Sequence, residues 1–317
     1  MKTMKSKFYS LALAAGMLSL TACSDDNTND SNNDKGNGIE NGSTLKGTIT
    51  EDVTLKAGNT YKLSGEYIVE AGATLNIEEG VKIISVYDNI VDYILVKQGA
   101  KINAVGTPDK PIVMTSEKEE PGAWGGIHIC GKAHTNAEGG KGSSEIGGAV
   151  YGGNDDADNS GTLQYIRLEY TGFAFDEEHE ANGISFYGVG NGTIVDHCEA
   201  YKGSDDGFEF FGGSVNVSNM VVVSCSDDSF DWTEGWNGKG TDLVAYQEAK
   251  ATLGYDCDCL IEADNNENDN AATPVSHPVL KNLILAGNGE SKQGIRLRRG
   301  TQADIDNAKV CGKGQPL

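Results

Sequence analysis

Six carboxylates in two related segments are the residues of this chain best placed to do chemistry. The segment DDGFEFF returns 22 residues later as DDSFDWT. The carboxylates are Asp205, Asp206 and Glu209 in the first segment and Asp227, Asp228 and Asp231 in the second. Carboxylates in such clusters can bind a divalent cation, hydrolyse glycosides as an acid and base pair, or cap turns by accepting backbone hydrogen bonds.

The spacing of the two segments indicates how they are positioned. A period just above twenty residues, with apolar residues alternating inside the unit, is typical of a solenoid in which each coil covers the next. Stacked strands lie about 4.8 Å apart, so equivalent carboxylates would become neighbours. Two such charges repel by roughly 0.9 kcal/mol under full water screening and by about 3.5 kcal/mol at an effective dielectric of about 20. A bound Ca²⁺ ion would offset this repulsion, with Asp206 and Asp228 as candidate ligands.

Turn capping is the simpler explanation for the same aspartates. Aspartate side chains at corners commonly accept hydrogen bonds from backbone N–H groups while they stay solvated. Because such turn aspartates are common, we favour this role over a cation site and carry both hypotheses forward.

The elements that carry these residues are predicted to be short strands. A small or polar residue followed by an apolar, a polar and an apolar residue recurs at GIHI, GISF, GFEF, SFDW and GIRL, and more weakly at LIEA. This alternation has the period of a β-strand. It places Ile127, Ile184, Phe208, Phe230 and Ile295 inward and His128, Ser185, Glu209, Asp231 and Arg296 outward. The chain is therefore expected to be an all-β solenoid of stacked strands.

Composition and charge agree with this fold. The 317 residues include 42 glycines and only six prolines, which suits short strands joined by tight corners, and 38% are hydrophobic, enough for a sizeable core. No stretch shows sustained helical periodicity, so a short corner helix is the most that we expect. The net charge of −22 argues against nucleic acid as a partner and favours divalent cations or neutral glycans.

The N-terminus has the organisation of a bacterial lipoprotein. Three lysines precede an apolar run, Leu11–Leu20, that is too short to span a bilayer, and the sequence LTAC then ends at Cys23. Residues 1–22 are predicted to be the signal peptide, and Cys23 is predicted to carry the lipid. An ordinary signal peptide with a chance cysteine is the alternative.

Residues 23–43 are predicted to form a flexible tether, and residues 44–317 a single β-helix domain. The tether consists almost entirely of small polar and charged residues, which cannot bury enough apolar surface to order the chain. The acidic SDD after Cys23 resembles the surface-export signals of lipoproteins from the Bacteroidota. We therefore expect a lipid-anchored protein of the outer membrane, exposed on the cell surface, with a periplasm-facing position as the alternative.

Cysteine, histidine and tryptophan give weaker signals. The six cysteines after Cys23 are expected to be buried as small apolar side chains, because no zinc-ligand spacing is present; their pairing as disulfides is left open. Surface or corner positions are expected for all five histidines. Trp124 and Trp232 are predicted to lie in the core, whereas Trp236 belongs to the loop EGWNGKG.

Residues of two long polar insertions are expected to determine which ligand binds. They cover His134–Ser160 and Asn265–Ser276, and binding sites on rigid scaffolds tend to lie in such excursions. The candidate ligand contacts are Trp236 and the outward side chains Glu209 and Asp231.

Several longer segments carry a family resemblance. They are AGATLNIEEGVKI (Ala71–Ile83), KPIVMTS (Lys110–Ser116), WGGIHICGKA (Trp124–Ala133), YGGNDDADNSGTLQYIRLEYTG (Tyr151–Gly172), DDGFEFFGGSVN (Asp205–Asn216) and LRRGT (Leu297–Thr301). Together they resemble the pectin-lyase-like, right-handed parallel β-helix lipoproteins of the Bacteroidota, from about Thr44 onward. The resemblance implies a right-handed parallel β-helix and little about activity. Members usually continue past LRRGT, so we expect a truncated C-terminal end with an uncapped last coil.

A polysaccharide lyase or glycoside hydrolase is the alternative function. SDDG (Ser204–Gly207) and IRLR (Ile295–Arg298) resemble the acid pair and the basic strand of polygalacturonase-like β-helix glycosidases, but the chain has no GHG. The alternative catalytic set is Asp205, Asp206, Asp227, Asp228 and Arg296, and a lyase could also use Arg298 or Arg299. Because the set is incomplete, we expect the protein to bind an extracellular glycan or another surface partner without catalysis.

Overall fold

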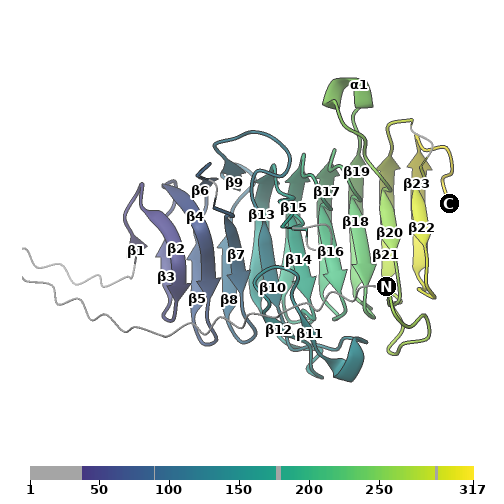
Figure 1. Ribbon diagram of the computed structural model, residues 1–317, viewed down its shortest axis with the longest axis horizontal. Helices are drawn as coiled ribbons and strands as arrows, with labels where there is room; N and C mark the ends of the chain where they lie inside the picture. The colour runs from purple at the N-terminus through teal and green to yellow at the C-terminus, as the bar shows by residue number, and fades with distance from the viewer. Residues whose placement is uncertain (1–37, 89, 176–179, 290–291) are drawn as a thin grey trace, which may run out of the picture. The chain divides into compact units, whose positions relative to one another are not determined.

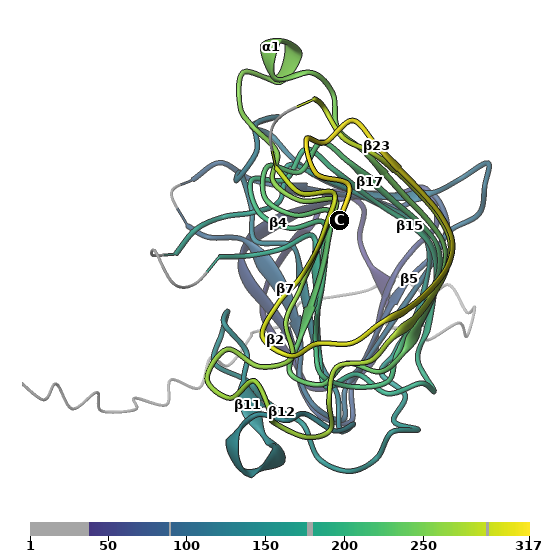
Figure 2. The ribbon, with the colours of Figure 1, turned by 90° about the vertical axis from the view of Figure 1, so that its right-hand side faces the viewer.

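The computed structural model describes residues 38–88, 90–175, 180–289 and 292–317. Over these residues the chain winds as a right-handed parallel β-helix, seen from the side in Figure 1 and along its axis in Figure 2. Twenty-one strands belong to one continuous sheet whose pairings are parallel, which confirms the predicted fold. None of the helices in the described ranges has the length and apolar character needed to span a lipid bilayer.

One face of the β-helix consists of short strands stacked coil on coil, and we call it the short-strand face. Its strands are β7 (Tyr93–Val96), β10 (Ile127–Cys130), β14 (Ile184–Tyr187), β16 (Phe208–Phe211), β18 (Phe230–Thr233), β20 (Ile261–Ala263) and β22 (Ile295–Leu297). The first of them pairs with β4 (Thr60–Val69), which pairs in turn with β2 (Thr44–Ile49).

Two further rows of strands complete each coil. In the first coils one row contains β1 (Gly38–Ile39), β3 (Val53–Leu55), β5 (Thr74–Ile77) and β8 (Lys101–Val105), and the other contains β6 (Lys82–Ser85) and β9 (Ile112–Ser116). Later coils replace both rows by one long strand, namely β13 (Gly161–Glu169), β15 (Ile194–Tyr201), β17 (Asn216–Val223), β19 (Lys239–Tyr246), β21 (Val279–Ala286) and β23 (Asp304–Cys311). Each long strand contains one residue with positive φ near its middle, and these are Tyr165, His197, Asn219, Asp242, Asn282 and Asn307.

The register of the short strands confirms the 22-residue period. Phe208 lies opposite Phe230, and Phe210 lies opposite Trp232 on the next coil. The rings of Phe208 and Phe230 stack with 6.0 Å between centroids, and those of Phe186 and Phe210 with 5.1 Å. Side chains of like size from successive coils therefore form a continuous apolar column, as expected for a solenoid.

Two insertions and one corner helix project from the coils (Figure 1). The first insertion contains a 3₁₀ turn, Glu138–Gly140, and an antiparallel hairpin of β11 (Gly142–Ser143) and β12 (Val150–Tyr151). The second insertion follows β20. The helix α1 (Lys250–Leu253) is the single α-helix of the described residues, and it ends at Gly254, whose φ of 82° suits glycine.

The described coils begin earlier than the sequence predicts. β1 pairs with β3 in parallel, and the Asn41 side-chain oxygen accepts a hydrogen bond from the Thr60 N–H at 2.9 Å. Polar composition places these residues in the predicted tether, but their backbone groups have partners on the next coil. The β-helix therefore includes residues before Thr44.

Candidate functional site

The outward side chains of the short-strand face form a row of carboxylates. The pairing of β14, β16, β18, β20 and β22 aligns Ser185, Glu209, Asp231, Glu262 and Arg296 coil by coil. The corner before β16 carries Asp205 and Asp206, and the equivalent corner before β18 carries Asp227 and Asp228. The structure thus places the two acidic segments of the sequence on adjacent coils.

Oxygen atoms of these carboxylates converge. One oxygen from each of Asp206, Glu209 and Asp231 lies within 4.8 Å of the other two. The same limit holds for Asp206 with Asp227 and Asp228, and for Glu180 with Asp205 and Asp227. Several carboxylate oxygens at this separation are what a divalent cation requires. We call Asp205, Asp206, Glu209, Asp227, Asp228 and Asp231 the acidic cluster.

Backbone N–H groups satisfy part of the acidic cluster. Asp206 accepts a hydrogen bond from the N–H of Asp228 at 2.8 Å, and Asp228 accepts one from the N–H of Cys259 at 2.6 Å. The structure therefore supports corner capping for both aspartates. The expectation that they stay solvated is wrong, because both side chains are buried between coils.

Glu209 and Asp231 differ from the corner aspartates in their hydrogen bonds. Glu209 accepts one from Asn182 Nδ2 at 2.6 Å. Asp231 Oδ1 is shielded from solvent and has no hydrogen-bond partner among the described residues. Leaving a buried acceptor unsatisfied costs about 1–3 kcal/mol, and more when it is charged. Asp231 is therefore the member of the acidic cluster with the strongest need for a proton or a cation.

Loss of surrounding water raises pKa values in the acidic cluster, including that of Asp227, which keeps an exposed surface. In each carboxyl group the removal of water is the largest cause, and repulsion from neighbouring carboxylates adds to it. The groups whose pKa is raised are Asp205, Asp206, Glu209, Asp227, Asp228 and Asp231. Because all six shift in the same direction, the cluster resists carrying its full negative charge.

The last two coils neutralise their carboxylates, unlike the acidic cluster. The ion pairs are Asp258 with Lys292 at 2.7 Å, Glu262 with Arg296 at 2.8 Å, and Asp264 with Arg298 at 2.9 Å and Arg299 at 2.6 Å. The arginines considered as bases for a lyase are thus held in ion pairs. Arg296 also lies two strands beyond Asp231 in the row, so the alternative catalytic set is only partly brought together.

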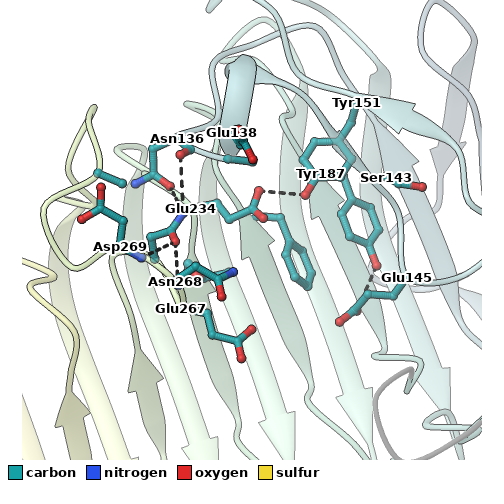
Figure 3. Close-up of a pocket in the computed structure, with 15 residues that line it drawn as sticks. Asn136, Glu138, Ser143, Glu145, Tyr151, Tyr187, Glu234, Glu267, Asn268 and Asp269 are labelled. Atoms are coloured by element: carbon teal, nitrogen blue, oxygen red, sulfur yellow. Dashed lines mark hydrogen bonds between the residues drawn. The ribbon is translucent and has the colours of Figure 1, made fainter.

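A pocket of about 590 Å³ lies at the ends of the middle short strands, and Figure 3 shows the residues that line it. Its floor contains Tyr187, Phe211 and Thr233, which align at the ends of β14, β16 and β18. Phe211 follows Glu209 by two residues on the same strand, so floor and cluster are about 7 Å apart along β16. The pocket volume lies within the range of about 300–1,000 Å³ that is typical of small-molecule sites.

Residues of both predicted insertions line this pocket. Ser143, Glu145 and Tyr151 come from the first insertion, and residues 266–269 and 272 come from the second. Five of the lining residues are acidic, and none of the described lining residues is basic. The acidic ones are Glu138, Glu145, Glu234, Glu267 and Asp269. The lining therefore disfavours an anionic ligand unless a cation accompanies it.

Side-chain amides join the two insertions. Asn136 donates from Nδ2 to the side-chain oxygen of Asn265 at 3.0 Å, and Asn266 donates from Nδ2 to the side-chain oxygen of Asn136 at 2.9 Å. All three residues are buried. We call Asn136, Asn265 and Asn266 the amide clasp, and its first and last members line the pocket.

The hairpin of the first insertion covers the N-terminal part of the short-strand face. Ile146 and Tyr151 belong to a second apolar cluster with Leu95 and Cys130, which point outward from β7 and β10. His128 on β10 is fully buried between the rings of Tyr93 and Tyr187, with Nε2 2.7 Å from the Gly125 carbonyl oxygen, and burial lowers its pKa to about 4. The prediction of a surface or corner position for His128 is therefore wrong.

Trp236 is a core residue and not a ligand contact. Its indole is buried, stacks on Phe210 with 4.1 Å between ring centroids, and donates from Nε1 to the Val215 carbonyl at 3.2 Å. Although EGWNGKG reads as a loop, the chain turns inward at the tryptophan. Trp124 and Trp232 lie in the core, as predicted.

Among the remaining cysteines and histidines of the described residues, Cys259 is the one that joins a cluster, because its Sγ lies within 4.8 Å of oxygens of Asp228 and Glu262. Cys130, Cys198, Cys225, Cys257 and Cys259 are buried as expected, whereas Cys311 is exposed, and all six thiols are free. Three histidines pair with an aspartate: His134 with Asp156, His197 with Asp196 and His277 with Asp304. Cys23 and His179 lie outside the described residues.

Glu145 and Glu234 are site residues that sequence reasoning missed. Glu234 accepts hydrogen bonds from Thr135 Oγ1 and Tyr151 OH, both at 2.7 Å. Glu145 accepts one from Tyr187 OH at 3.2 Å and lies close enough to the acidic cluster to raise its pKa values. Glu234 directly follows DDSFDWT, a position that could have drawn attention, whereas nothing in the sequence around Glu145 predicts where the hairpin folds.

Comparison with known families agrees with the fold. The family model of a pectate-lyase-like β-helix domain matches residues 47–317, and the chain belongs to this family. A search of curated proteins found no match, and a search of solved structures found none either. Membership of the family defines the scaffold, while activity depends on the site that the scaffold carries.

Proposed function

We propose that this protein is a lipid-anchored surface protein that binds an extracellular glycan with the help of a divalent cation and without catalysis. The observation that carries the proposal is the convergence of Asp206, Glu209 and Asp231 beside a pocket with an aromatic floor and polar walls. Ca²⁺ is the first candidate for the cation.

The chemistry of the acidic cluster supports a cation. Ca²⁺ takes about six to eight oxygen ligands and accepts carboxylates readily. Asp206 and Asp228 each use one oxygen to cap a backbone N–H, and a carboxylate oxygen of Asp206 lies within 4.8 Å of one of Asp231, whose Oδ1 has no partner among the described residues. An acid and base pair requires two carboxyl groups whose pKa values are pushed apart, whereas here all are raised together. A cation would neutralise them as a group.

The lining of the pocket supports a glycan as the ligand. Phe211 and Tyr187 stack on each other with 4.5 Å between ring centroids and form the apolar part of the floor. Carboxylates and amides surround that floor, and they can accept and donate the hydrogen bonds that sugar hydroxyl groups need. A carbohydrate site combines apolar surface with polar edges, and Phe211, the more accessible ring of the stack, supplies apolar surface here.

The N-terminal sequence supports the location. The apolar run, the LTAC sequence and the acidic residues after Cys23 favour lipidation and export to the outer face of the outer membrane. A periplasm-facing anchor is the alternative. Labelling of intact cells with a membrane-impermeant reagent distinguishes the two positions, because only a surface-exposed domain reacts.

Calorimetry tests the cation. The mature chain, made soluble by Cys23→Ser, should release or absorb heat when Ca²⁺ is added, and the double variant Asp206→Asn with Asp228→Asn should not. Asparagine keeps an oxygen that accepts the backbone N–H, so the corners are preserved. Asp306→Asn, an exposed aspartate on β23, is the matched control and should bind like the parent. Absence of any heat with the parent chain would remove the cation from the proposal.

A glycan array with and without Ca²⁺ tests the ligand. The proposal expects binding to neutral or amino-bearing glycans that is weakened when Ca²⁺ is chelated. If no glycan is retained under either condition, the glycan-binding function is wrong.

A glycoside hydrolase is the second candidate function. The observation that favours it is the proximity of the Glu209 and Asp231 carboxyl oxygens beside the pocket. Paired carboxylates at such short range are the residues that retaining glycosidases use. Cleavage of polyuronides or neutral glycans by the purified chain, lost in Glu209→Gln, would replace the binding function by this one.

A further inference from the structure

The pocket is blocked in both directions along the β-helix axis. On one side the hairpin of the first insertion fills the space above β7 and β10, where Ile146 and Ala149 pack with Leu95 and Cys130. On the other side stands the loop of residues 266–272, which follows β20 (Figure 3). The floor between them spans only β14, β16 and β18, which is about 10 Å from the first strand to the third.

The amide clasp closes a third side of the pocket. Asn136 and Asn266 line the cavity and are joined through their side chains, and Asn265 anchors both insertions behind them. The Asn136 N–H also donates to the Glu234 carbonyl oxygen at 2.9 Å, which fixes the clasp to the chain that follows β18. Because these amides are buried and hydrogen-bonded, they form a packed wall and not a loose rim.

We infer that the pocket receives the end of a glycan chain and rejects its internal segments. The inference rests on the proposed glycan-binding function and specifies which part of the glycan is bound. A polymer that crosses a site needs an entrance and an exit, and walls on three sides leave no second opening opposite the first. A volume of about 590 Å³ accommodates a small ligand, on the order of two sugar rings, and not a long segment.

The negative charge of the lining limits which kinds of terminal sugar the pocket can bind. Five carboxylates and no basic side chain line the described pocket itself, and the proposed cation lies outside this lining at the acidic cluster, so a terminal uronate inside the pocket would be repelled. A neutral sugar can donate hydroxyl hydrogen bonds to these oxygens, and an amino sugar adds an ammonium group that carboxylates and aromatic rings both attract. The terminal unit is therefore a neutral or amino-bearing sugar.

An array of malto-, cello- and chitosan oligosaccharides tests the inference. Each oligosaccharide is attached to the surface through its reducing end, through its non-reducing end, or through both, and is probed with the mature Cys23→Ser chain in Ca²⁺. We expect retention on one of the singly attached forms to exceed that on the doubly attached form by about tenfold or more, because a pocket of this size is filled by terminal units alone. Lengthening the oligosaccharide beyond about three units should add little affinity.

Asn266→Ala tests the wall itself. Removal of this amide opens the clasp, so doubly attached oligosaccharides should gain binding while the singly attached forms keep theirs. The matched control is Asn103→Ala, which deletes an amide to amide hydrogen bond of 3.1 Å to Asn76 between two coils of another row and should leave the end preference unchanged.

The possible results separate the inference from the function on which it rests. Equal retention of singly and doubly attached forms by the parent chain overturns recognition of the chain end and leaves glycan binding in place. Retention of none of the oligosaccharides, with or without Ca²⁺, overturns glycan binding and the inference together. An unchanged end preference in Asn266→Ala, with the fold intact by circular dichroism, shows that the clasp is not the wall that excludes internal segments.

Discussion

Two parts of one row of outward carboxylates differ in whether a basic side chain forms an ion pair with them. On β20 and β22, Glu262 is paired with Arg296 on the next coil, and Asp264 is paired with Arg298. On β16 and β18, Glu209 and Asp231 occupy the same outward position, yet no ion pair among the described residues joins either of them to a basic side chain. The backbone register is the same in both parts, so the difference lies in side-chain identity alone.

This difference indicates what the acidic cluster requires. A basic residue one coil away is sufficient to neutralise a carboxylate on this scaffold, as Arg296 shows for Glu262. At the acidic cluster burial raises the pKa of Asp231 overall, although Arg298 lowers it without forming an ion pair with Asp231 among the described residues. Protons or a bound cation are the remaining ways to remove the charge.

The largest expected effect is a loss of stability as pH rises in the absence of divalent cations. Unfolded Asp and Glu ionise near pH 4, whereas burial keeps Asp206, Glu209 and Asp231 protonated to higher pH in the folded chain. The folded state then binds more protons than the unfolded state. Stability should fall by about 1.4 kcal/mol per pH unit for each such carboxyl, measured by urea unfolding from about pH 5 upward.

Ca²⁺ and His128 provide internal controls for this pH dependence. Saturating Ca²⁺ should flatten the fall, because the bound ion favours the ionised carboxylates. His128 acts in the opposite direction: its folded pKa of about 4 lies below the usual value near 6.5, so its contribution is lost as pH falls between these values, with or without Ca²⁺. A fall toward alkaline pH that Ca²⁺ leaves unchanged would contradict cation binding by the acidic cluster.

A smaller effect is expected when the neutralised part of the row is broken. Arg298→Met removes a partner of both Glu262 and Asp264 and leaves two largely buried carboxylates undercompensated. We expect a loss of about 2–3 kcal/mol in unfolding free energy, less than for a fully buried pair because Arg298 is partly exposed. Lys281→Met, which breaks an exposed pair with Asp306, should change stability by no more than about 0.5 kcal/mol. Equal losses in the two variants would show that burial does not set the strength of these pairs.

Periodic features were the predictable part of this molecule. A 22-residue period places Phe208 on Phe230 because each coil repeats the backbone path of the previous one, and the acidic corners follow the same rule. Alternation within a strand determines which side chain leaves the core. Alternation does not determine what covers an outward side chain, and His128 points outward yet is fully buried beside the rings of Tyr93 and Tyr187.

The aperiodic parts of the site could not be predicted. Glu145 comes from an insertion that no other coil repeats, so no internal comparison in the sequence locates it. Trp236 was misread for a related reason, since glycine and asparagine around it indicate a turn but not the direction in which the tryptophan points. The bend of each long strand at a residue such as His197 or Asn219 is likewise a property of the assembled coil.

The smallest expected effect comes from two variants in the row of outward carboxylates. They test most directly the comparison between its unpaired and ion-paired parts, because they should change stability in opposite directions. Asp231→Asn removes a buried carboxylate oxygen that has no partner, so without divalent cations it should raise the free energy of unfolding by about 1–2 kcal/mol. Glu262→Gln weakens the ion pair with Arg296 and should lower it. In Ca²⁺ the order of Asp231→Asn and the parent should reverse, since only the parent keeps the full set of ligands. Urea unfolding in both conditions measures this, and a destabilised Asp231→Asn in chelator would mean that the carboxylate serves the fold and not a ligand.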